Sequence, residues 1–161
     1  MKSLSPAHYF HVQTARCCLE SGDAPAARKE LEKIPAEFRA HPDVLEVRWA
    51  FEARAGEWEA CLETARVLRS AAPERPTGWI KYSYTLSRLN RVKEALDALF
   101  PAAREFAQVP MVAYNLACYA AQLQHFWEAE RWLKQSFELG GTDYRNMARK
   151  DKQLRAIWDR I

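Results

Sequence analysis

The sequence has few glycines and lacks the long apolar runs and hairpin dipeptides that define several classes of protein. Only five glycines occur among 161 residues, and no Asn-Gly or Asp-Gly dipeptide is present. Nowhere do about 18 apolar residues follow one another, and the N-terminus MKSLSPAHYFHV lacks the apolar run of a signal peptide. These absences argue against hairpin-rich sheets and membrane insertion, and we expect a cytoplasmic protein.

The four cysteines show no C-x-x-C spacing and all fall within predicted helices, at Cys17, Cys18, Cys61 and Cys118. This pattern indicates reduced thiols rather than a disulfide framework. The neighbouring pair Cys17 and Cys18 could be redox-active, but ordinary helix packing is the interpretation that we favour.

Phosphate-cradling and nucleophile-elbow motifs are also missing, since the sequence has no G-x-x-x-x-G-K, G-x-G-x-x-G or G-x-S-x-G. His8 and His11 stand at helical spacing and could be two metal ligands, but no third ligand is evident. The acidic pair Glu57 and Glu59 lies among arginines and indicates a solvated helix face. We therefore expect no enzymatic activity, no cofactor and no metal.

The formal net charge is +3, and the imbalance is confined to the C-terminal end. Residues 142–161 hold six basic and three acidic side chains, so the remaining residues balance at 18 of each sign. A nucleic-acid-binding protein more often has a basic stripe along its body. We therefore expect no nucleic-acid partner and interpret the basic end as a solvated helix face.

What the sequence does contain is a 34-residue period. Gly22, Gly56, Asn90 and Gln124 are small turn positions spaced by 34 residues, and apolar residues between them recur every three or four positions. The period divides residues 8–41, 42–75, 76–109 and 110–141 into four pairs of helices. Proline opens three of these units, as its fixed φ suits the first turn of a helix. Helix pairs of this length must stack on neighbours to bury their apolar faces.

The third unit resembles the tetratricopeptide repeat (TPR) most closely, with matches at Trp79, Tyr82, Ser83, Leu86, Ala95, Leu99 and Ala102. The resemblance implies an all-α, right-handed α-solenoid in which residues 1–161 form a single TPR domain of four repeats and a C-terminal cap. The second unit departs from the family pattern, because Arg48 and Glu52 stand where it asks for larger apolar residues and Trp49 where it asks for a small one.

Other prolines and glycines predict interruptions. Pro35 should end the second helix of the first unit early, and Pro101 should break the second helix of the third unit near Phe100. Gly140 and Gly141 should stop the second helix of the fourth unit. We expect capping helices over residues 142–150 and 153–160, whose apolar side chains Met147, Leu154, Ile157 and Trp158 cover the last repeat.

The resemblance also implies a concave groove lined by the first helix of each pair. Its basic and aromatic centre predicts an acidic, partly apolar peptide as ligand, although the same side chains could be ordinary solvated ones. The arrangement of lysine and asparagine that some relatives use to hold chaperone C-termini is not matched here. The predicted ligand-contacting residues are Arg16, Arg54, Ile80, Lys81, Tyr84, Arg88, Tyr114, Asn115 and Gln122.

The sequence thus predicts a non-enzymatic adaptor that binds a segment of another protein. One alternative is a secretion-type chaperone that holds a client segment, as TPR chaperones of similar length do. Another is a self-assembling structural subunit, which an exposed patch of Trp58, Phe126 and Trp127 would favour. The sequence leaves the partner and the oligomeric state open.

Overall fold

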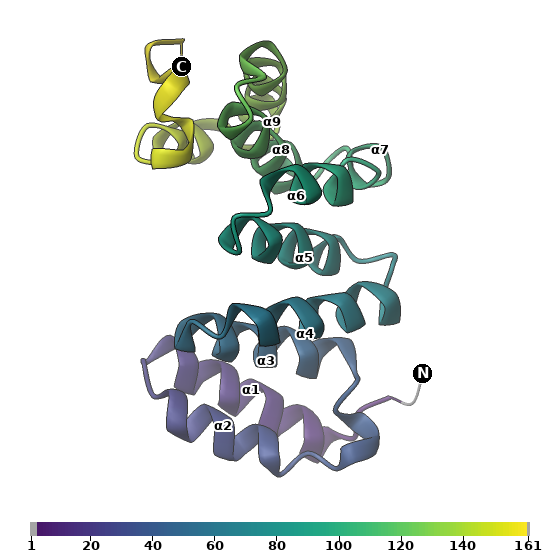
Figure 1. The fold of residues 1–161 in the computed structure, drawn as a ribbon. Helices are drawn as coiled ribbons and strands as arrows, with labels where there is room; N and C mark the ends of the chain where they lie inside the picture. The colour runs from purple at the N-terminus through teal and green to yellow at the C-terminus, as the bar shows by residue number, and fades with distance from the viewer. Residues whose placement is uncertain (1–2, 161) are drawn as a thin grey trace. The chain divides into compact units, whose positions relative to one another are not determined.

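The computed structural model describes residues 3–160, and every regular element in that range is helical (Figure 1). None of these helices is both long and apolar enough to cross a membrane. In chain order the elements are α1 (Pro6–Glu20), α2 (Ala24–Glu32), η1 (Ala36–Phe38), α3 (Pro42–Ala55), α4 (Trp58–Ala71), α5 (Pro76–Arg88), α6 (Val92–Leu99), α7 (Ala102–Glu105), α8 (Pro110–Gln122), α9 (Phe126–Ala148) and η2 (Lys152–Arg160).

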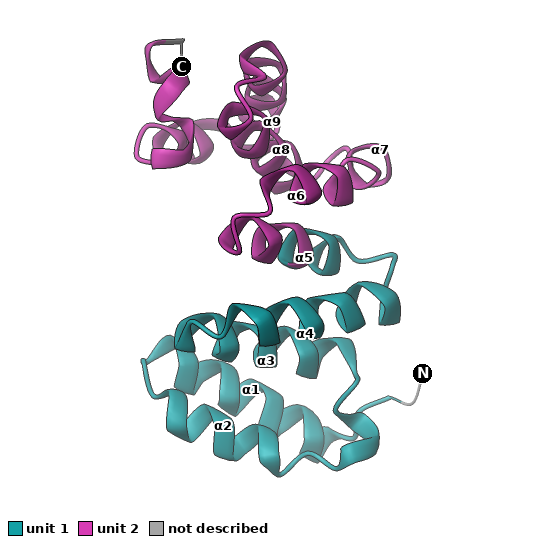
Figure 2. Ribbon diagram, in the orientation of Figure 1, with its two compact units in different colours: residues 1–81 teal, residues 82–161 magenta. Residues whose placement is uncertain are grey.

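The chain divides into two compact units, residues 1–81 and residues 82–161 (Figure 2). The boundary falls within α5. We describe each unit by itself, and the single domain expected from the sequence stays a prediction.

The four turn positions behave as the 34-residue period predicts. All have a positive φ, at 86° for Gly22, 75° for Gly56, 61° for Asn90 and 64° for Gln124. Glycine adopts this left-handed conformation without steric penalty, and asparagine tolerates it better than most residues. Each position follows the first helix of a pair, where the 34-residue period predicts a turn.

The prolines also act as predicted. Helices α3, α5 and α8 begin at Pro42, Pro76 and Pro110, and α2 ends at Glu32, shortly before Pro35. The second helix of the third repeat (residues 76–109) is broken, because α6 ends at Leu99 and α7 begins at Ala102. Pro101 lacks the N–H that a continuous helix would require there.

The core of the first unit lies where α1 packs on α2 and both pack on α3. Its buried members have the apolar side chains that helical periodicity assigns to inward faces. Where α5 begins, it approaches α4 so closely that a Cβ on Gly78 would lie 2.7 Å from the Cα of Arg69. The core cluster comprises Val12, Ala15, Leu19, Ala27, Ile34, Val44 and Val47.

In the second unit α8 is the central helix and packs against α6, α9 and η2. Every residue of α8 from Val112 to Ala121 is buried. Helix α9 changes direction at Gly141, whose φ of 62° and ψ of −143° are not helical, so the predicted interruption is confirmed. The remainder of α9 and then η2 form the cap, in which Leu154 and Ile157 are buried, Met147 is partly buried and Trp158 is 38% exposed.

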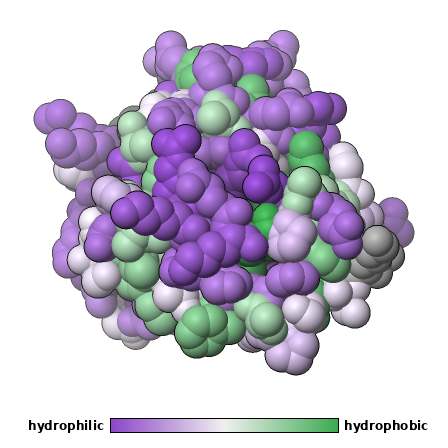
Figure 3. All heavy atoms as spheres, turned by 90° about the horizontal axis from the view of Figure 1, so that it is seen from below, coloured by the Kyte–Doolittle hydropathy of each residue, from purple (hydrophilic) through white to green (hydrophobic). Residues whose placement is uncertain are grey.

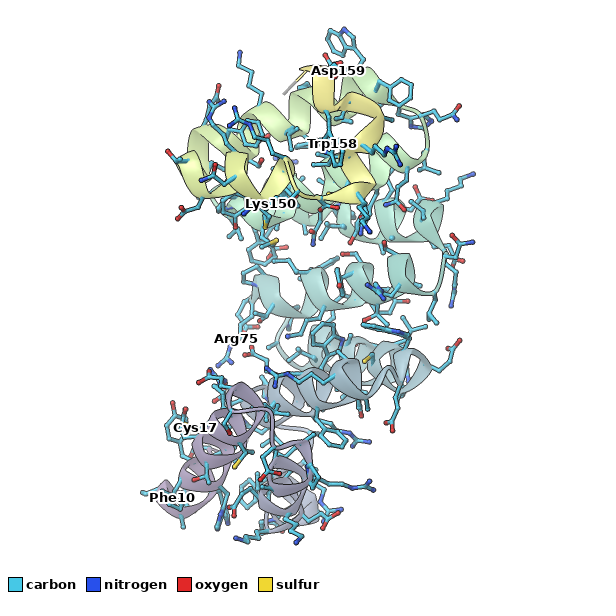
Figure 4. The ribbon with its side chains drawn as sticks, turned by 90° about the vertical axis from the view of Figure 1, so that its left-hand side faces the viewer. Phe10, Cys17, Arg75, Lys150, Trp158 and Asp159 are labelled. Carbon is cyan, nitrogen blue, oxygen red and sulfur yellow. The ribbon has the colours of Figure 1, made fainter. Side chains whose placement is uncertain are left out.

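Hydrophilic side chains predominate in the centre of the surface that Figure 3 shows, and apolar side chains form separate patches around them. Elsewhere on the first unit, Phe10 is 66% exposed and projects from α1 (Figure 4). Scattered exposed apolar side chains of this kind are ordinary on a protein surface.

Candidate functional site

The first unit has a hollow between α1 and α3 with a volume of about 250 Å³, which we call the α1–α3 hollow. Three predicted groove residues, Arg16, Arg54 and Lys81, meet in its lining. They come from three consecutive repeats, because the first helix of each pair presents the same face. The other lining residues are Leu19, Glu20, Glu46, Val47 and Ala50.

Lys81 is the most buried of the three cations. Its Nζ lies 3.9 Å from the centre of the Trp49 ring, within the range of a cation–π interaction. Burial lowers the pKa of Lys81 to about 8, with a smaller contribution in the same direction from Arg16, while Glu46 opposes the shift. Lys81 is therefore a cation at neutral pH whose charge is only partly solvated.

Trp49 explains one irregularity of the second repeat. The family pattern asks for a small residue at this position, but here the partly buried indole supplies the face on which Lys81 lies. The departure from the pattern thus places an aromatic ring beneath a groove cation.

Glu46 is the main acidic group of the α1–α3 hollow. Its Oε1 accepts a hydrogen bond of 2.9 Å from the Thr77 hydroxyl, and its Oε2 lies 3.9 Å from an Arg16 terminal nitrogen. Together with Glu20 it leaves the hollow with three cations against two carboxylates, a difference of +1 when Lys81 is protonated. The hollow can therefore accept an additional negative charge.

The edge of the same groove face carries a further ion pair. Arg75 donates a hydrogen bond of 2.7 Å from Nη1 to Asp43 Oδ1, and Figure 4 shows where Arg75 lies. This bond raises the pKa of the Arg75 guanidinium. Because Asp43 already has a cationic partner, it does not offset the charge of the hollow.

Two predicted groove residues on α8, in the second unit, are buried and not exposed to a ligand. Tyr114 is 3% exposed and Asn115 is 7% exposed, because η2 packs on α8. Tyr114 Oη donates a hydrogen bond of 2.9 Å to Asp151 Oδ2, and burial is the largest cause of a raised pKa of Tyr114. The same carboxylate oxygen lies 3.7 Å from Cys118 Sγ.

Gln122 also contacts the cap. Its Nε2 donates a hydrogen bond of 3.0 Å to Gln153 Oε1 and one of 3.2 Å to the backbone carbonyl of Cys118. We therefore correct the predicted set: Tyr114 and Asn115 are buried and Gln122 is bonded to the cap, so these three do not form an open groove here. Of the other predicted residues, Ile80 and Tyr84 are partly buried and Arg88 is exposed on α5.

Asp151 is a residue of this contact between α8 and η2 that was not predicted from the sequence. Besides bonding Tyr114, its Oδ1 accepts a hydrogen bond from the Gln153 backbone N–H at 2.9 Å, so it also starts η2. Nearby, Trp158 Nε1 lies 3.2 Å from the carbonyls of both Ala148 and Asp151 (Figure 4). A sequence signal existed, since an acidic residue followed by Leu154 and Ile157 at helical spacing is typical of a capped apolar helix.

The alternative chemical sites have structural partners. His11 Nδ1 lies 2.8 Å from Glu30 Oε2, and the His8 ring lies against the Phe38 ring, with centroids 4.6 Å apart and planes inclined by 47°. All four cysteines are free thiols. Cys18 packs against the core as predicted, whereas Cys17 is exposed, so the packing interpretation is wrong for Cys17.

Comparison with known proteins identifies the fold. No protein-family model and no curated protein matches the sequence. Among solved structures, the chain is similar to TTC0263, a thermophilic TPR protein of Thermus thermophilus, with a TM-score of 0.79 and 20% identity over 96% of this chain and 83% of that one. It is also similar to the MamA RS-1 ArsTM double mutant, with a TM-score of 0.72 and 14% identity over 96% of this chain and 90% of that one.

The chain therefore has the TPR fold, an all-α architecture of paired antiparallel helices, as the sequence predicted. Proteins with this fold generally mediate protein–protein interactions and typically have no catalytic site.

Proposed function

We propose that this protein is a non-enzymatic adaptor that binds an acidic, partly apolar segment of another protein in the α1–α3 hollow. The observation that carries the proposal is the convergence of Arg16, Arg54 and Lys81 on one hollow of the first unit.

The three cations suit a carboxylate ligand in different ways. Arg16 and Arg54 are exposed, and a guanidinium can bind a carboxylate through two parallel hydrogen bonds. Lys81 is partly buried, and an ion pair is stronger where water is partly excluded. A ligand carboxylate near Lys81 would also stabilise its charged form, which burial disfavours.

The apolar part of the ligand would contact mainly Ala50, which is partly buried, because Leu19 and Val47 are only 3% and 2% exposed. Leu19, Val47 and Ala50 lie among the charged residues of the α1–α3 hollow. A peptide with an apolar side chain next to an acidic one therefore matches the lining better than a purely acidic peptide does. A TPR groove of this kind is preformed, which lowers the conformational cost of binding.

A charge-reversal experiment tests this function. An array of peptides that pair acidic with apolar residues is screened for binding to the wild-type protein, to Arg16→Glu/Arg54→Glu and to Lys93→Glu/Lys134→Glu. The last variant makes the same change in net charge at exposed lysines of α6 and α9 in the second unit. We expect only the first variant to lose the peptides that the wild type selects.

Equal binding of the same peptides by all three folded proteins would show that the hollow is not the site. Circular dichroism of each variant establishes that loss of binding does not reflect unfolding.

The self-assembling alternative receives less support. Trp127 is 78% exposed, but Trp58 and Phe126 are partly buried. Of the predicted patch only Trp127 is exposed, and one tryptophan is a smaller apolar surface than a stable interface uses. A dimer in light scattering would favour the chaperone or structural-subunit alternative over a monomeric adaptor.

A further inference from the structure

The first unit has a second cavity, which is lined in part by irregular residues of the second repeat. Arg48 and Glu52, which stand at positions where the repeat pattern asks for apolar residues, line a cavity of about 330 Å³. Residues of α2, of α3 and of the segments that follow η1 and α3 complete it, and we call it the α2–α3 cavity. It shares no lining residue with the α1–α3 hollow.

Glu52 is the unusual group of this cavity. Its side chain is nearly fully buried, and its Oε1 accepts a hydrogen bond of 2.8 Å from Arg48 Nε. Its Oε2 is also buried, yet has no hydrogen-bond partner among residues 3–160. An unsatisfied buried carboxylate oxygen is unfavourable, and such an atom in a native protein calls for a donor.

Three guanidinium groups also line the α2–α3 cavity, and each makes its hydrogen bond through Nε. Arg28 donates to Glu32, Arg39 to the carbonyl of Ile34, and Arg48 to Glu52. Within residues 3–160, the terminal nitrogens of these arginines donate no hydrogen bond. They are therefore the donors that a ligand carboxylate would use.

The rest of the lining balances these charges and adds apolar surface. Glu32, Glu52 and Glu57 offset the three arginines, so a ligand that carries one charge of each sign leaves the cavity neutral. Leu31, Val44 and Phe51 are the apolar residues of the lining, and the Arg28 guanidinium carbon lies 6.0 Å from the Phe51 ring centre. The volume falls within the range of small-molecule sites.

We propose that the α2–α3 cavity binds a small zwitterion with an apolar side chain, of the size of a free amino acid or a dipeptide. Its ammonium group donates to the Glu52 carboxylate, its carboxylate accepts from the terminal nitrogens of Arg39 and Arg48, and its side chain packs on Phe51 and Leu31. This site is independent of the proposed adaptor function, and either can fail without the other.

Calorimetric titration of the wild-type protein tests the proposal. The probes are L-phenylalanine and glycyl-L-phenylalanine, compared with N-acetyl-L-phenylalanine, which lacks the ammonium group, and L-phenylalaninamide, which lacks the carboxylate. We expect at least one zwitterion to bind, and each blocked analogue to bind about tenfold more weakly or not at all, since each loses a charge-assisted hydrogen bond.

Two substitutions separate the site from general effects. Glu52→Gln keeps the shape of the side chain and should weaken zwitterion binding about tenfold. The control Glu63→Gln, at an exposed glutamate of α4 that pairs with Arg66, should bind as the wild type does. Failure of both zwitterions to bind the folded wild type would overturn the proposal, as would equal affinity of Glu52→Gln.

Thermal unfolding without ligand gives a second measurement. Removing a buried carboxylate that has an unpartnered oxygen should leave the midpoint of Glu52→Leu equal to or above that of the wild type, while zwitterion binding is lost. A large drop in the midpoint of Glu52→Leu, with zwitterion binding by Glu52→Gln unchanged, would assign Glu52 a purely structural role and contradict the proposal.

Discussion

The groove faces of the two units differ at equivalent repeat positions. Arg16, Arg54 and Lys81 of the first unit correspond, at multiples of the 34-residue period, to Cys118, Gln122 and Asn115 of α8 in the second unit. The three residues of the first unit are cations around an open hollow, whereas the three of the second are uncharged and lie beneath or beside the C-terminal segment.

This difference shows that the same face of the fold is covered in one unit and open in the other. In the second unit it closes the end of the repeat array by packing on η2, with Leu154 and Ile157 buried and Asp151 bonded to Tyr114. In the first unit no such segment covers the lining residues within residues 3–81, and charge is retained there. Charged groove residues are therefore informative about binding only where the cap does not reach.

The largest effect is expected where the second unit is closed. Leu154→Ala removes a fully buried side chain from the contact of η2 with α8, and should lower the free energy of unfolding by about 3 kcal/mol. Chemical denaturation measures this change. Trp127→Ala, at an exposed residue of the same unit, is the control and should change stability by less than about 0.5 kcal/mol. Similar small effects of both substitutions would mean that η2 does not close the second unit.

A smaller effect is expected at the polar contact between cap and helix. Asp151→Ala leaves the buried hydroxyl of Tyr114 without its acceptor and removes the hydrogen bond that starts η2, so stability should fall by about 2 kcal/mol. Hydrogen exchange should become faster along α8. Asp159→Ala, at an exposed residue of the same segment, should leave both quantities unchanged, and faster exchange in this control would contradict the role given to Asp151.

In the first unit, exchanging a cation for its second-unit counterpart should weaken binding. Arg54→Gln places at the hollow the residue that occupies the equivalent position in α8, and the affinity for an acidic, partly apolar peptide should fall about tenfold. Fluorescence anisotropy with a labelled peptide measures this change. The reciprocal substitution Gln122→Arg should not raise the affinity, and a gain there would remove the distinction between the two faces.

The smallest effect is a pH dependence specific to Lys81. The pKa of this lysine is about 8 in the folded protein and 10.5 in the reference state, so the unfolded chain binds the proton more tightly between these values. Deprotonation of Lys81 should therefore make the free energy of unfolding of the wild type rise between pH 8 and pH 10.5, and this rise should be absent from Lys81→Met. Peptide affinity should fall over the same range, because the charged form predominates only below the pKa. Identical pH profiles of wild type and variant would contradict this assignment.

Much of the fold could be predicted because its signals are local. The turn at Gly56 depends on a left-handed residue, the break after Leu99 on the missing N–H of Pro101, and the change of direction in α9 on Gly141. Each is a backbone requirement that the sequence states directly. The TPR fold follows from repeating such units.

The site was less predictable because its properties depend on contacts between repeats. The repeat register assigns Tyr114 and Asn115 to the groove, but only the position of η2 shows that they are buried. Likewise the sequence shows Trp49 as a departure from the repeat pattern, whereas its contact with Lys81 depends on a residue one repeat later. Sequence register identifies faces, and packing determines which of them are open.

The most direct test of the central claim is an NMR titration of the wild-type protein with an acidic, partly apolar peptide selected from the array. The account predicts that backbone amide shifts concentrate on α1 and α3 near Arg16 and Arg54 and at Lys81 in α5, and that the resonances of α8 change little. Shifts that concentrate on α8 and η2 instead would contradict the claim that the open face of the first unit is the binding site.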